Sequence, residues 1–467
     1  MGALRPQTPH RSPRQAFGGS KGYACLRQEE QKKKRLAEPE RTPVNQPVMY
    51  NITLKTILKE ILPIKGFVYQ SVAWDPLMPN ALLLQVAERQ GCRGICSGCG
   101  KKGPGYDRQP KRKWNFIPFW GLLVFLVYAP RRIDCRNCGP TIERVPWASG
   151  KHHTCDAFRL FLAQWARHLS WAETARIFHV GWADVFGSVK WVVAFGLENR
   201  DLSGVIALGV DEIWVGAKEK FWTLVYQIDE GGTRLLWVGQ NRTKATFDLF
   251  CDVFGTEFCS GIKVICSDML KAYISGAARH MPDALLILDR FHVVKKLTDA
   301  VDEIRRSETL ARAKAGLEPL LKKMRWAFLK KRKNWTPGQR KRMRAMEGAA
   351  LQTLHAYVLV EAFQHFWTYK SATWAGKFMD AWCEKVQNSH LAPLKKVART
   401  IQTHRSLLLN YFATVKRYSS GIVEGLNAKV KLTIRRSYGF RTADAREVAL
   451  YHALGKLPEP EFTHSFF

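Results

Sequence analysis

Two groups of residues in this chain could do chemistry, and the first is a set of four cysteines. Cys96 and Cys99 form one C-x-x-C pair, and Cys135 and Cys138 form a second. A glycine lies in or beside each pair, which permits the tight turn that lets two thiolates face one ion. Four sulfur ligands complete the tetrahedral coordination of a zinc ion and leave no open position. The pattern therefore predicts a structural Zn²⁺ site within residues 91–147.

The spacing of the cysteines leaves alternatives open. The 35 residues between the pairs exceed the roughly 15–20 of a simple ribbon, but their strand, turn and strand pattern predicts a hairpin insert. Cys92 lies outside the pairing and could substitute for one ligand, and the cysteines could also be unliganded thiols. Eleven cysteines in 467 residues are too few for a disulfide scaffold, which favours metal binding in a reducing cytoplasm.

The second group is three acidic residues that stand where neutral or apolar residues would fit the local pattern. Asp211 lies in a strand-like run, Asp268 directly follows another, and Glu424 belongs to a helix near the C-terminus. Three converging carboxylates repel one another, and hard divalent cations with oxygen ligands relieve that repulsion. Each acid alone could also be an ordinary charge, so the elements that position them decide the matter.

The elements around the two aspartates follow a known order. Strands are expected at 205–215, 221–228, 235–238, 262–266 and 284–288, and helices at 244–254 and 270–280. The order β-β-β-α-β-α-β is the layout of the ribonuclease-H-like fold, with its first and fourth strands side by side, about 4.8 Å apart. Asp211 and Asp268 would then approach each other, while Glu212 points to the opposite face. Asp289 and His292 follow the last strand and could assist, although Asp289 could equally cap the next helix.

A helix that starts at residue 421 is expected to carry the third acid. Glu424, Asn427 and Lys431 would share one face at positions i, i+3 and i+7. The apolar residues expected to pack on the sheet from the opposite face are Ile422, Leu426 and Val430. An acid on such a helix is well placed to reach the strand ends.

The charge balance predicts a polyanionic partner. Lys and Arg number 73 against 40 Asp and Glu, a net charge of +33, although a merely soluble basic protein can also carry such an excess. Residues 155–197 show a helix, a capped short helix, a glycine turn and another helix. This order of helices and turns is typical of a helix-turn-helix, and other small helical bundles share it.

A second basic segment lies in a helical stretch, residues 298–412. The stretch from Arg305 to Arg344 contains fifteen Lys and Arg residues and two acidic residues. This segment is expected to follow a phosphate backbone, unless it is only a solvated helical face. The candidate DNA-binding residues are Lys330, Lys331, Arg332 and Lys333, together with Arg435, Arg436 and Arg441.

In combination, the motifs resemble the bacterial insertion-sequence transposases of the ISL-three family, of the DDE class. The matching motifs are GVDE at 209–212, SDM at 267–269, LDRFH at 288–292, GIVEGLN at 421–427, RSYGFR at 436–441 and LPEPE at 457–461. The resemblance runs from about residue 49 to the end. It implies that Asp211, Asp268 and Glu424 form the catalytic triad, that the cysteine pairs belong to an end-recognition module, and that 155–197 is the helix-turn-helix.

The resemblance also implies a reaction and its partners. The three acids would hold two Mg²⁺ ions, which Mn²⁺ could replace. The two ions would lie about 3.5–4 Å from each other, one at the attacking oxygen and one at the leaving oxygen. Water attack at the element's end would free a 3′-OH that then attacks target DNA. Double-stranded DNA is the expected partner, bound at terminal inverted repeats by a homo-oligomer in the bacterial cytoplasm, at the nucleoid. A non-catalytic DNA-binding regulator and a structure-specific nuclease on the same fold are the alternatives.

The expected architecture is a multidomain α/β protein. A ribonuclease-H-like mixed sheet is interrupted by a basic all-helical insertion and preceded by a zinc-binding module and a helix-turn-helix. The expected segments are a disordered extension (1–48), the zinc module (49–147), the helix-turn-helix (151–200), the catalytic domain (205–297 and 413–467) and the insertion (298–412). Met49 could be the true start. No window reaches the ~18 apolar residues of a membrane helix, and no apolar segment of a secretory signal follows the N-terminus.

Overall fold

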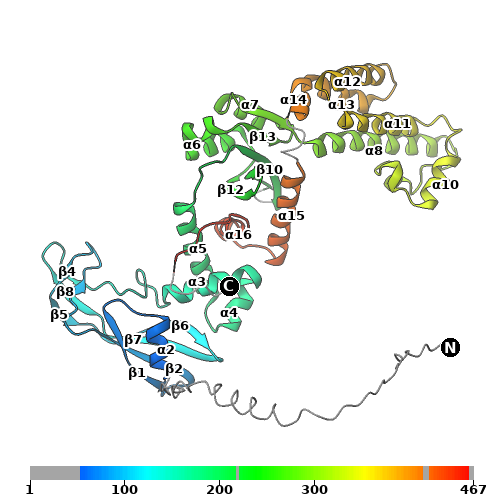
Figure 1. Cartoon of the computed structure of the whole chain (residues 1–467). Helices are drawn as coiled ribbons and strands as arrows, with labels where there is room; N and C mark the ends of the chain where they lie inside the picture. The colour runs from blue at the N-terminus through cyan, green and yellow to red at the C-terminus, as the bar shows by residue number, and fades with distance from the viewer. Residues whose placement is uncertain (1–52, 217–219, 414–419, 462–467) are drawn as a thin grey trace, which may run out of the picture. The chain divides into compact units, whose positions relative to one another are not determined.

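The computed structural model describes residues 53–216, 220–413 and 420–461 (Figure 1). The expected extension 1–48 and the start at Met49 lie outside the described residues. The chain divides into two units, residues 1–57 and 58–467, with α2 (Leu54–Ile61) across the division. The second unit has a mixed α/β architecture, in agreement with the expected fold class.

A four-stranded sheet and a set of short strands make up the first part of this unit. The sheet has the order β1-β2-β7-β6, from β1 (Phe67–Asp75), β2 (Met78–Glu88), β6 (Arg112–Phe119) and β7 (Leu122–Tyr128). The short strands are β3 (Gly94–Ile95), β4 (Lys102–Gly103), β5 (Gly105–Arg108), β8 (Arg131–Cys135) and β9 (Gly139–Ile142). Strands β6 and β7 form the hairpin expected between the cysteine pairs. Their turn has Trp120 and Gly121 at φ 50° and 77°, the left-handed backbone that tight hairpins require.

Three helices follow: α3 (Asp156–His168), α4 (Trp171–Ile177) and α5 (Trp182–Asn199). The expected capping box is present, because the Ser170 hydroxyl accepts from the Glu173 N–H and the Glu173 carboxylate accepts from the Ser170 N–H. Helices α4 and α5 meet at 117°. Among the described residues no single helix is long and apolar enough to cross a membrane, and only this bent pair reaches the required length and composition together.

The second sheet carries the two aspartates. Its strands are β10 (Ala207–Gly216), β11 (Lys220–Asp229), β12 (Gly232–Gln240), β13 (Val264–Ser267) and β14 (Leu285–Leu288). The order is β12-β11-β10-β13-β14, with the first three antiparallel and β13 and β14 parallel to β10. The expected pairing of the first and fourth strands is confirmed. Val210 pairs with Ser267, so Asp211 and Asp268 directly follow paired residues at one edge of the sheet.

Helices cover both faces of this sheet (Figure 1). Helices α6 (Lys244–Gly261) and α7 (Lys271–His280) pack on one face with Leu208 and Val210. Helices α15 (Ser420–Arg436) and α16 (Ala443–Leu454) pack on the other, in a core that also holds Ala207 and Ile213. Because side chains alternate along β10, Asp211 faces α15 and Glu212 faces the opposite side, as predicted.

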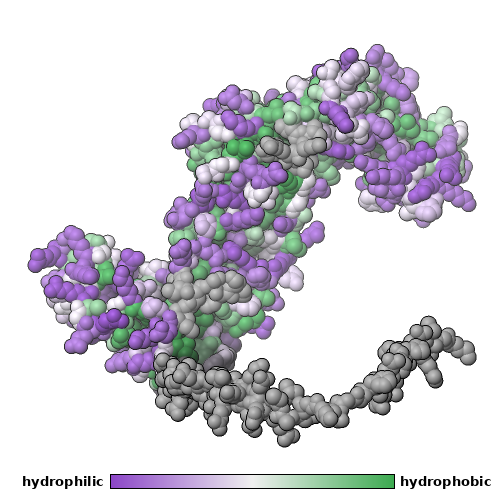
Figure 2. Space-filling model, in the orientation of Figure 1, coloured by the Kyte–Doolittle hydropathy of each residue, from purple (hydrophilic) through white to green (hydrophobic). Residues whose placement is uncertain are grey.

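The helical insertion begins within the helix that directly follows the last strand of the sheet. Helix α8 (Arg290–Lys314) starts at the end of β14 and runs for 25 residues, so the proposed boundary between 297 and 298 falls inside it. The helices that follow are α9 (Arg325–Phe328), η1 (Arg332–Asn334), α10 (Pro337–Ala345), α11 (Gln352–Phe363), η2 (Gln364–Thr368), α12 (Ala372–Gln387), α13 (Ala392–Thr403), α14 (Arg405–Leu409) and η3 (Asn410–Ala413). Trp335, Trp367 and Trp382 are buried in their common core, whereas Trp326 and Trp374 are exposed. Hydrophilic side chains dominate the surface around α10 (Figure 2).

Candidate metal centres and basic surfaces

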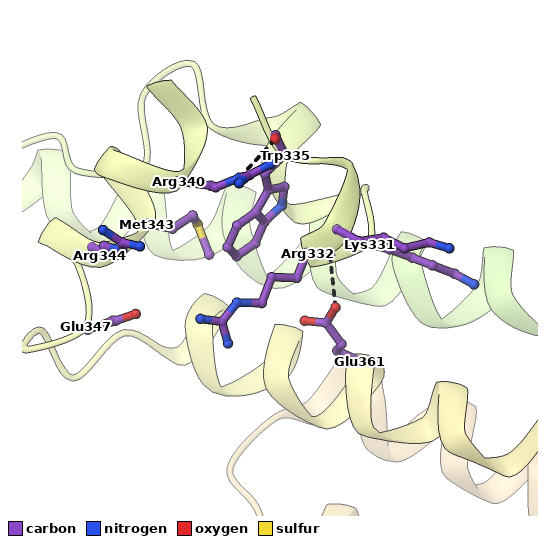
Figure 3. A pocket seen from close by; sticks show the side chains of 9 residues that line it. Lys331, Arg332, Trp335, Arg340, Met343, Arg344, Glu347 and Glu361 are labelled. Carbon is purple, nitrogen blue, oxygen red and sulfur yellow. Dashed lines mark hydrogen bonds between the residues drawn. The ribbon is translucent and has the colours of Figure 1, made fainter. Parts of the chain in front are cut away.

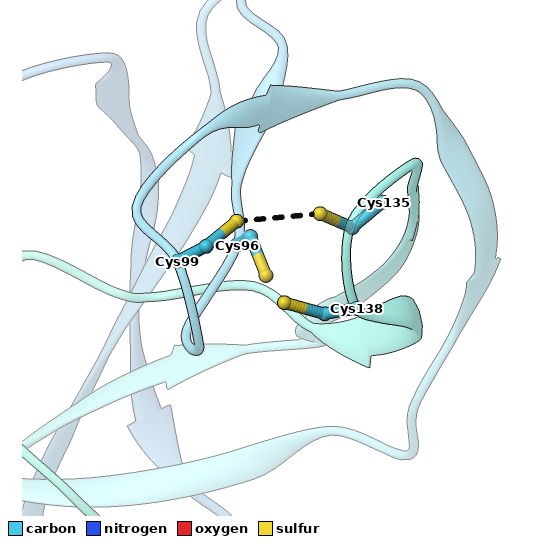
Figure 4. Close-up of side chains that lie close together, drawn as sticks. All are labelled: Cys96, Cys99, Cys135 and Cys138. Atoms are coloured by element: carbon cyan, nitrogen blue, oxygen red, sulfur yellow. Dashed lines mark hydrogen bonds between the residues drawn. The ribbon is translucent and has the colours of Figure 1, made fainter.

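The four cysteines of the two pairs lie together as predicted. Their sulfur atoms are all within 4.8 Å of one another and point toward a common centre (Figure 4). The residue after each pair, Gly100 or Gly139, has φ of 72° or 71°, the left-handed conformation that turns the chain back so that both thiols face inward. Cys92 is not part of this cluster. Four thiols at this separation match the tetrahedral ligand set of a structural zinc ion.

The electrostatics of the cluster also favour a cation. The Thr141 hydroxyl lies 3.2 Å from Cys96 Sγ and is the main cause that lowers the pKa of Cys96, to about 6. Contacts with the sulfurs of Cys99 and Cys96 raise the pKa of Cys138, to about 12. The first thiolate that forms therefore hinders the next, and a central positive charge would remove this repulsion.

Asp211 and Asp268 form the centre of the second candidate site. The pKa of Asp211 is raised to about 6, mainly by burial. The hydrogen bond from the Glu212 N–H and the nearby His292 oppose this rise, and the carboxylates of Asp289 and Asp268 add to it. Burial also raises the pKa of Asp268, and the charge of Glu212 adds to the rise. Buried acids that repel one another are characteristic of sites that bind cations or transfer protons.

Of the four candidates for an accessory role, Asp289, His292, Asn427 and Lys431, the first two lie in the same cluster as the aspartates. His292 Nε2 is 3.9 Å from Asp211 Oδ1 and 3.6 Å from Asp289 Oδ2. Asp289 Oδ1 also accepts from the Phe291 N–H at 2.7 Å, so this residue is the N-cap of α8. The expected cap of α8 by Asp289 is therefore present, and the second oxygen of this carboxylate faces His292.

Helix α15 reaches the site through a close approach to β10. A Cβ atom on Gly209 would lie 2.5 Å from Val423 Cγ2, so only glycine allows the helix to pack at this distance. One turn further along α15, Asn427 Nδ2 donates to Asp211 Oδ2 at 2.5 Å, and the Tyr226 hydroxyl donates to Asn427 Oδ1 at 2.7 Å. The helix thereby fixes one oxygen of Asp211.

The prediction that Asn427 shares one helix face with Glu424 and Lys431 is wrong. Asn427 is buried and lies on the sheet side of α15 with Val423, Leu426 and Val430, whereas Glu424 and Lys431 are exposed. Residues three apart in a helix differ by about 60° around its axis, so Glu424 and Asn427 fall on opposite sides of the border between surface and core. In the described part of the chain, the Glu424 side chain makes no hydrogen bond or ion pair with either aspartate.

Two contacts of the site were not anticipated. The Tyr226 hydroxyl donates to Asn427. The position of Tyr226 opposite Gly209 in the antiparallel pairing of β10 and β11 is the one signal that could have pointed to this contact. Glu212 pairs with Arg242 at 2.6 Å on the other face of the sheet. Neither partner follows from local sequence, because both depend on register and on loop conformation.

The basic segment of the insertion forms a cavity of about 640 Å³. The exposed side chains of Lys331 and Arg332 stand on one side, and Arg340 and Arg344 on another, with the buried Trp335 between them (Figure 3). Lys333 also lines the cavity and is exposed. Lys330 is also exposed. The Glu361 carboxylate accepts from the Arg332 backbone N–H at 2.9 Å, which leaves the Arg332 guanidinium available.

The three arginines expected near the C-terminus are exposed. Arg435 and Arg436 end α15, and Arg441 precedes α16. The Arg436 guanidinium donates to the Arg167 carbonyl at 3.1 Å, which links α15 to the end of α3. These cations therefore lie beside the three helices of residues 156–199 and not beside the insertion.

Two segments of the chain match families of known proteins. The ISL3 (ISL-three) family model, described as "Transposase", matches residues 208–449, and one described as "zinc-finger of transposase IS204/IS1001/IS1096/IS1165" matches residues 93–138. The chain is 26% identical over 381 residues to the transposase for insertion sequence element IS1001 of Bordetella parapertussis, which covers 81% of this chain and 92% of the relative. It is 28% identical over 390 residues to the transposase for insertion sequence element IS1557 of Mycobacterium tuberculosis, with 78% and 86% covered. The two matched segments contain all four cysteines and all three candidate acids.

Proposed function

This chain belongs to the ISL3 family of insertion-sequence transposases, and on that premise we propose that it is a DDE transposase with a ribonuclease-H-like core. It would bind the terminal inverted repeats of its element, cut there, and join the freed ends to target DNA. The observation that carries the proposal is the cluster of Asp211, Asp268, Asp289 and His292 at the carboxyl ends of β10, β13 and β14. In open α/β sheets this edge is where ligands bind.

The acidic donor set fits divalent cations. Oxygen ligands that repel one another in a partly buried site are what hard cations bind. Asp211, Asp268 and Glu424 would hold two Mg²⁺ ions, or Mn²⁺ in their place. When bound, these ions would stabilise the attacking and leaving oxygens of an in-line phosphoryl transfer.

The protein's own residues would fix the geometry of that site. Asn427 holds Oδ2 of Asp211, and Tyr226 holds Asn427 in turn, so the orientation of the Asp211 carboxylate is set by two elements far apart in sequence. Oδ1 of Asp211 faces His292. Glu424 lies one turn before Asn427 on the same helix, anchored at its neighbour Val423, and its exposed side chain can turn toward the strand ends.

The four cysteines would hold one structural Zn²⁺. Their thiols come from two turns, with the β6–β7 hairpin between them in sequence, so the ion would tie together two ends of the zinc module. With all four positions taken by sulfur, the ion has no site for water or substrate. Its proposed role is therefore to stabilise the module that recognises the element's ends.

The DNA-binding surfaces are proposed from shape and charge. Helices α3, α4 and α5 would act as a helix-turn-helix, since α4 and α5 cross at 117°, close to the 90–120° of that motif. Lys330, Lys331, Arg332 and Lys333 would contact phosphates, so affinity should fall with salt at roughly −0.9 in log–log slope per neutralised phosphate. Two copies of the chain would act together on the paired ends of the element.

The test uses the purified full chain and DNA that carries the element's two ends with their flanks. With Mg²⁺ the proposal expects cuts at the element boundary and covalent joining of the 3′ ends to a target duplex, and neither without Mg²⁺. Binding without cutting would instead identify a regulator, and cutting without joining would identify a nuclease.

A further inference from the structure

A cavity of about 720 Å³ lies between the three-helix segment and the C-terminal helices. It is enclosed by the end of α3, the start of α4, the first turns of α5, the end of α15 and one side of α16. The volume falls within the roughly 300–1,000 Å³ of small-molecule sites. It is separate from the acidic cluster and from the cysteines, and none of the roles proposed above uses it.

The walls of this cavity are aromatic. The Trp171 ring lies 5.8 Å from Trp182, 5.5 Å from Phe186 and 6.0 Å from Phe440, measured between ring centroids. Trp182 stacks on Phe186 at 5.3 Å and is 48% exposed. Tyr438 at the rim is 98% exposed and holds a left-handed backbone with φ of 54°. Large aromatic faces that remain open to solvent are available to stack on a planar ligand.

The polar groups of the cavity select for a negative charge. Among the described residues that line it there are three arginines, Arg167, Arg436 and Arg441, and no carboxylate. Arg167 is paired with Glu459 at 2.8 Å, whereas no ion pair of Arg436 or Arg441 is found in the described part of the chain. His452 is the one buried polar residue of the lining, and its Nε2 has no hydrogen-bond partner.

We propose that this cavity binds an unpaired nucleotide of the DNA. The base would stack among Trp171, Trp182 and Phe440, its phosphate would pair with Arg436 and Arg441, and His452 would hydrogen bond to the base edge. Aromatic stacking with cationic contacts to the backbone is the general chemistry of unpaired nucleotide recognition. The proposal rests on the DNA-binding function proposed above, because Trp182 lies in the first turn of α5, where a recognition helix meets base edges.

The experiment measures the preference for an unpaired base. Full-length protein is titrated against a duplex with one bulged 2-aminopurine and against the fully paired duplex of the same length. The wild type should bind the bulged duplex about 10-fold more tightly, the scale of one stacked base, and should quench the 2-aminopurine fluorescence. In Trp182→Ala and Arg441→Gln the ratio of the two affinities should fall to about one, whatever the change in affinity for the paired duplex. Trp374→Ala, which changes another exposed tryptophan that lies in the insertion, should keep both the preference and the affinity for the paired duplex.

Each other outcome overturns the assignment in a distinguishable way. Equal affinity of the wild type for both duplexes would refute the nucleotide site and leave the proposed DNA binding standing. Absence of binding to either duplex would refute DNA binding itself and this site with it. An unchanged preference in Trp182→Ala and Arg441→Gln, with a changed oligomeric state in the absence of DNA, would show that a second copy of the chain occupies the cavity.

Discussion

The two candidate metal centres of this chain are assembled in opposite ways. The cysteine site takes its four ligands from two turns, each with its two cysteines three residues apart, and the sulfurs already lie within 4.8 Å of one another. The proposed acidic site would take its ligands from β10, from the end of β13 and from α15, which spread over more than two hundred residues. Its aspartates are adjacent, but among the described residues Glu424 makes no hydrogen bond or ion pair with them.

The difference follows from what each site has to do. A structural ion holds a fold together, so its ligands are fixed by local backbone geometry and are closed to solvent chemistry. A catalytic site must admit substrate, and its buried acids keep raised pKa values that cost stability until a cation is bound. The cysteine site should therefore govern folding, and the acidic site should govern activity while opposing stability.

The largest effect is expected at the cysteine site. Cys135→Ser removes a buried ligand, and structural zinc sites contribute on the order of 10 kcal/mol at neutral pH. We expect loss of the one bound zinc per chain, unfolding of the module around residues 93–138, and loss of end-specific DNA binding. Zinc content and thermal unfolding measure this, with Cys92→Ser as the matched control because Cys92 lies outside the cluster. Stoichiometric zinc in Cys135→Ser would contradict the ligand assignment.

The next effect concerns cleavage. Asp211→Asn and Asp268→Asn each remove one negative charge at nearly constant volume, and should lower Mg²⁺-dependent nicking at least about 100-fold, the scale of losing one electrostatic stabiliser. Binding to the element's ends should stay within a factor of about two to three. Asp289→Asn is the control, because its main contact is the cap of α8, and a smaller loss is expected. A greater loss in Asp289→Asn than in Asp268→Asn would show that the second aspartate has been misassigned.

Glu424 sharpens the comparison because its side chain is exposed. Glu424→Gln should abolish nicking to a similar extent and leave the melting temperature unchanged, since no contact of the folded chain is lost. Glu303→Gln, an exposed acid on α8, should change neither property. Full activity of Glu424→Gln would remove this helix from the mechanism.

The comparison also shows why the sequence predicted one site more completely than the other. The C-x-x-C spacing with its glycines contains nearly the whole geometry of the cysteine cluster, so local pattern was enough. The pairing of β10 with β13 followed from the order of strands and helices. The placement of Asn427 against Tyr226 could not be predicted, because it depends on how closely α15 packs on Gly209 and on the register of β11.

The smallest predicted effect is the pH dependence of stability at the acidic site. The pKa of Asp211 in the folded chain, about 6, lies above its ordinary value, 3.8, because the side chain is buried. The folded state therefore binds more protons than the unfolded state between these pH values, and stability falls as the pH rises through this window. The loss levels off about one pH unit above the folded pKa, at on the order of 2–3 kcal/mol.

Asp211→Asn does not titrate, so its stability should lack this decline. In buffer free of Mg²⁺ but with zinc retained, its unfolding free energy should exceed that of the wild type by an amount that grows from about pH 5 to about pH 7 and then stays constant. Denaturant unfolding from pH 5 to pH 8 measures the difference. Excess Mg²⁺ should narrow it, because the ion binds the wild-type site and stabilises the folded state by mass action. A variant less stable than the wild type at pH 8 without Mg²⁺ would mean that the Asn427 hydrogen bond outweighs the cost of the buried charge, and the acidic site would then support folding as the cysteine site does.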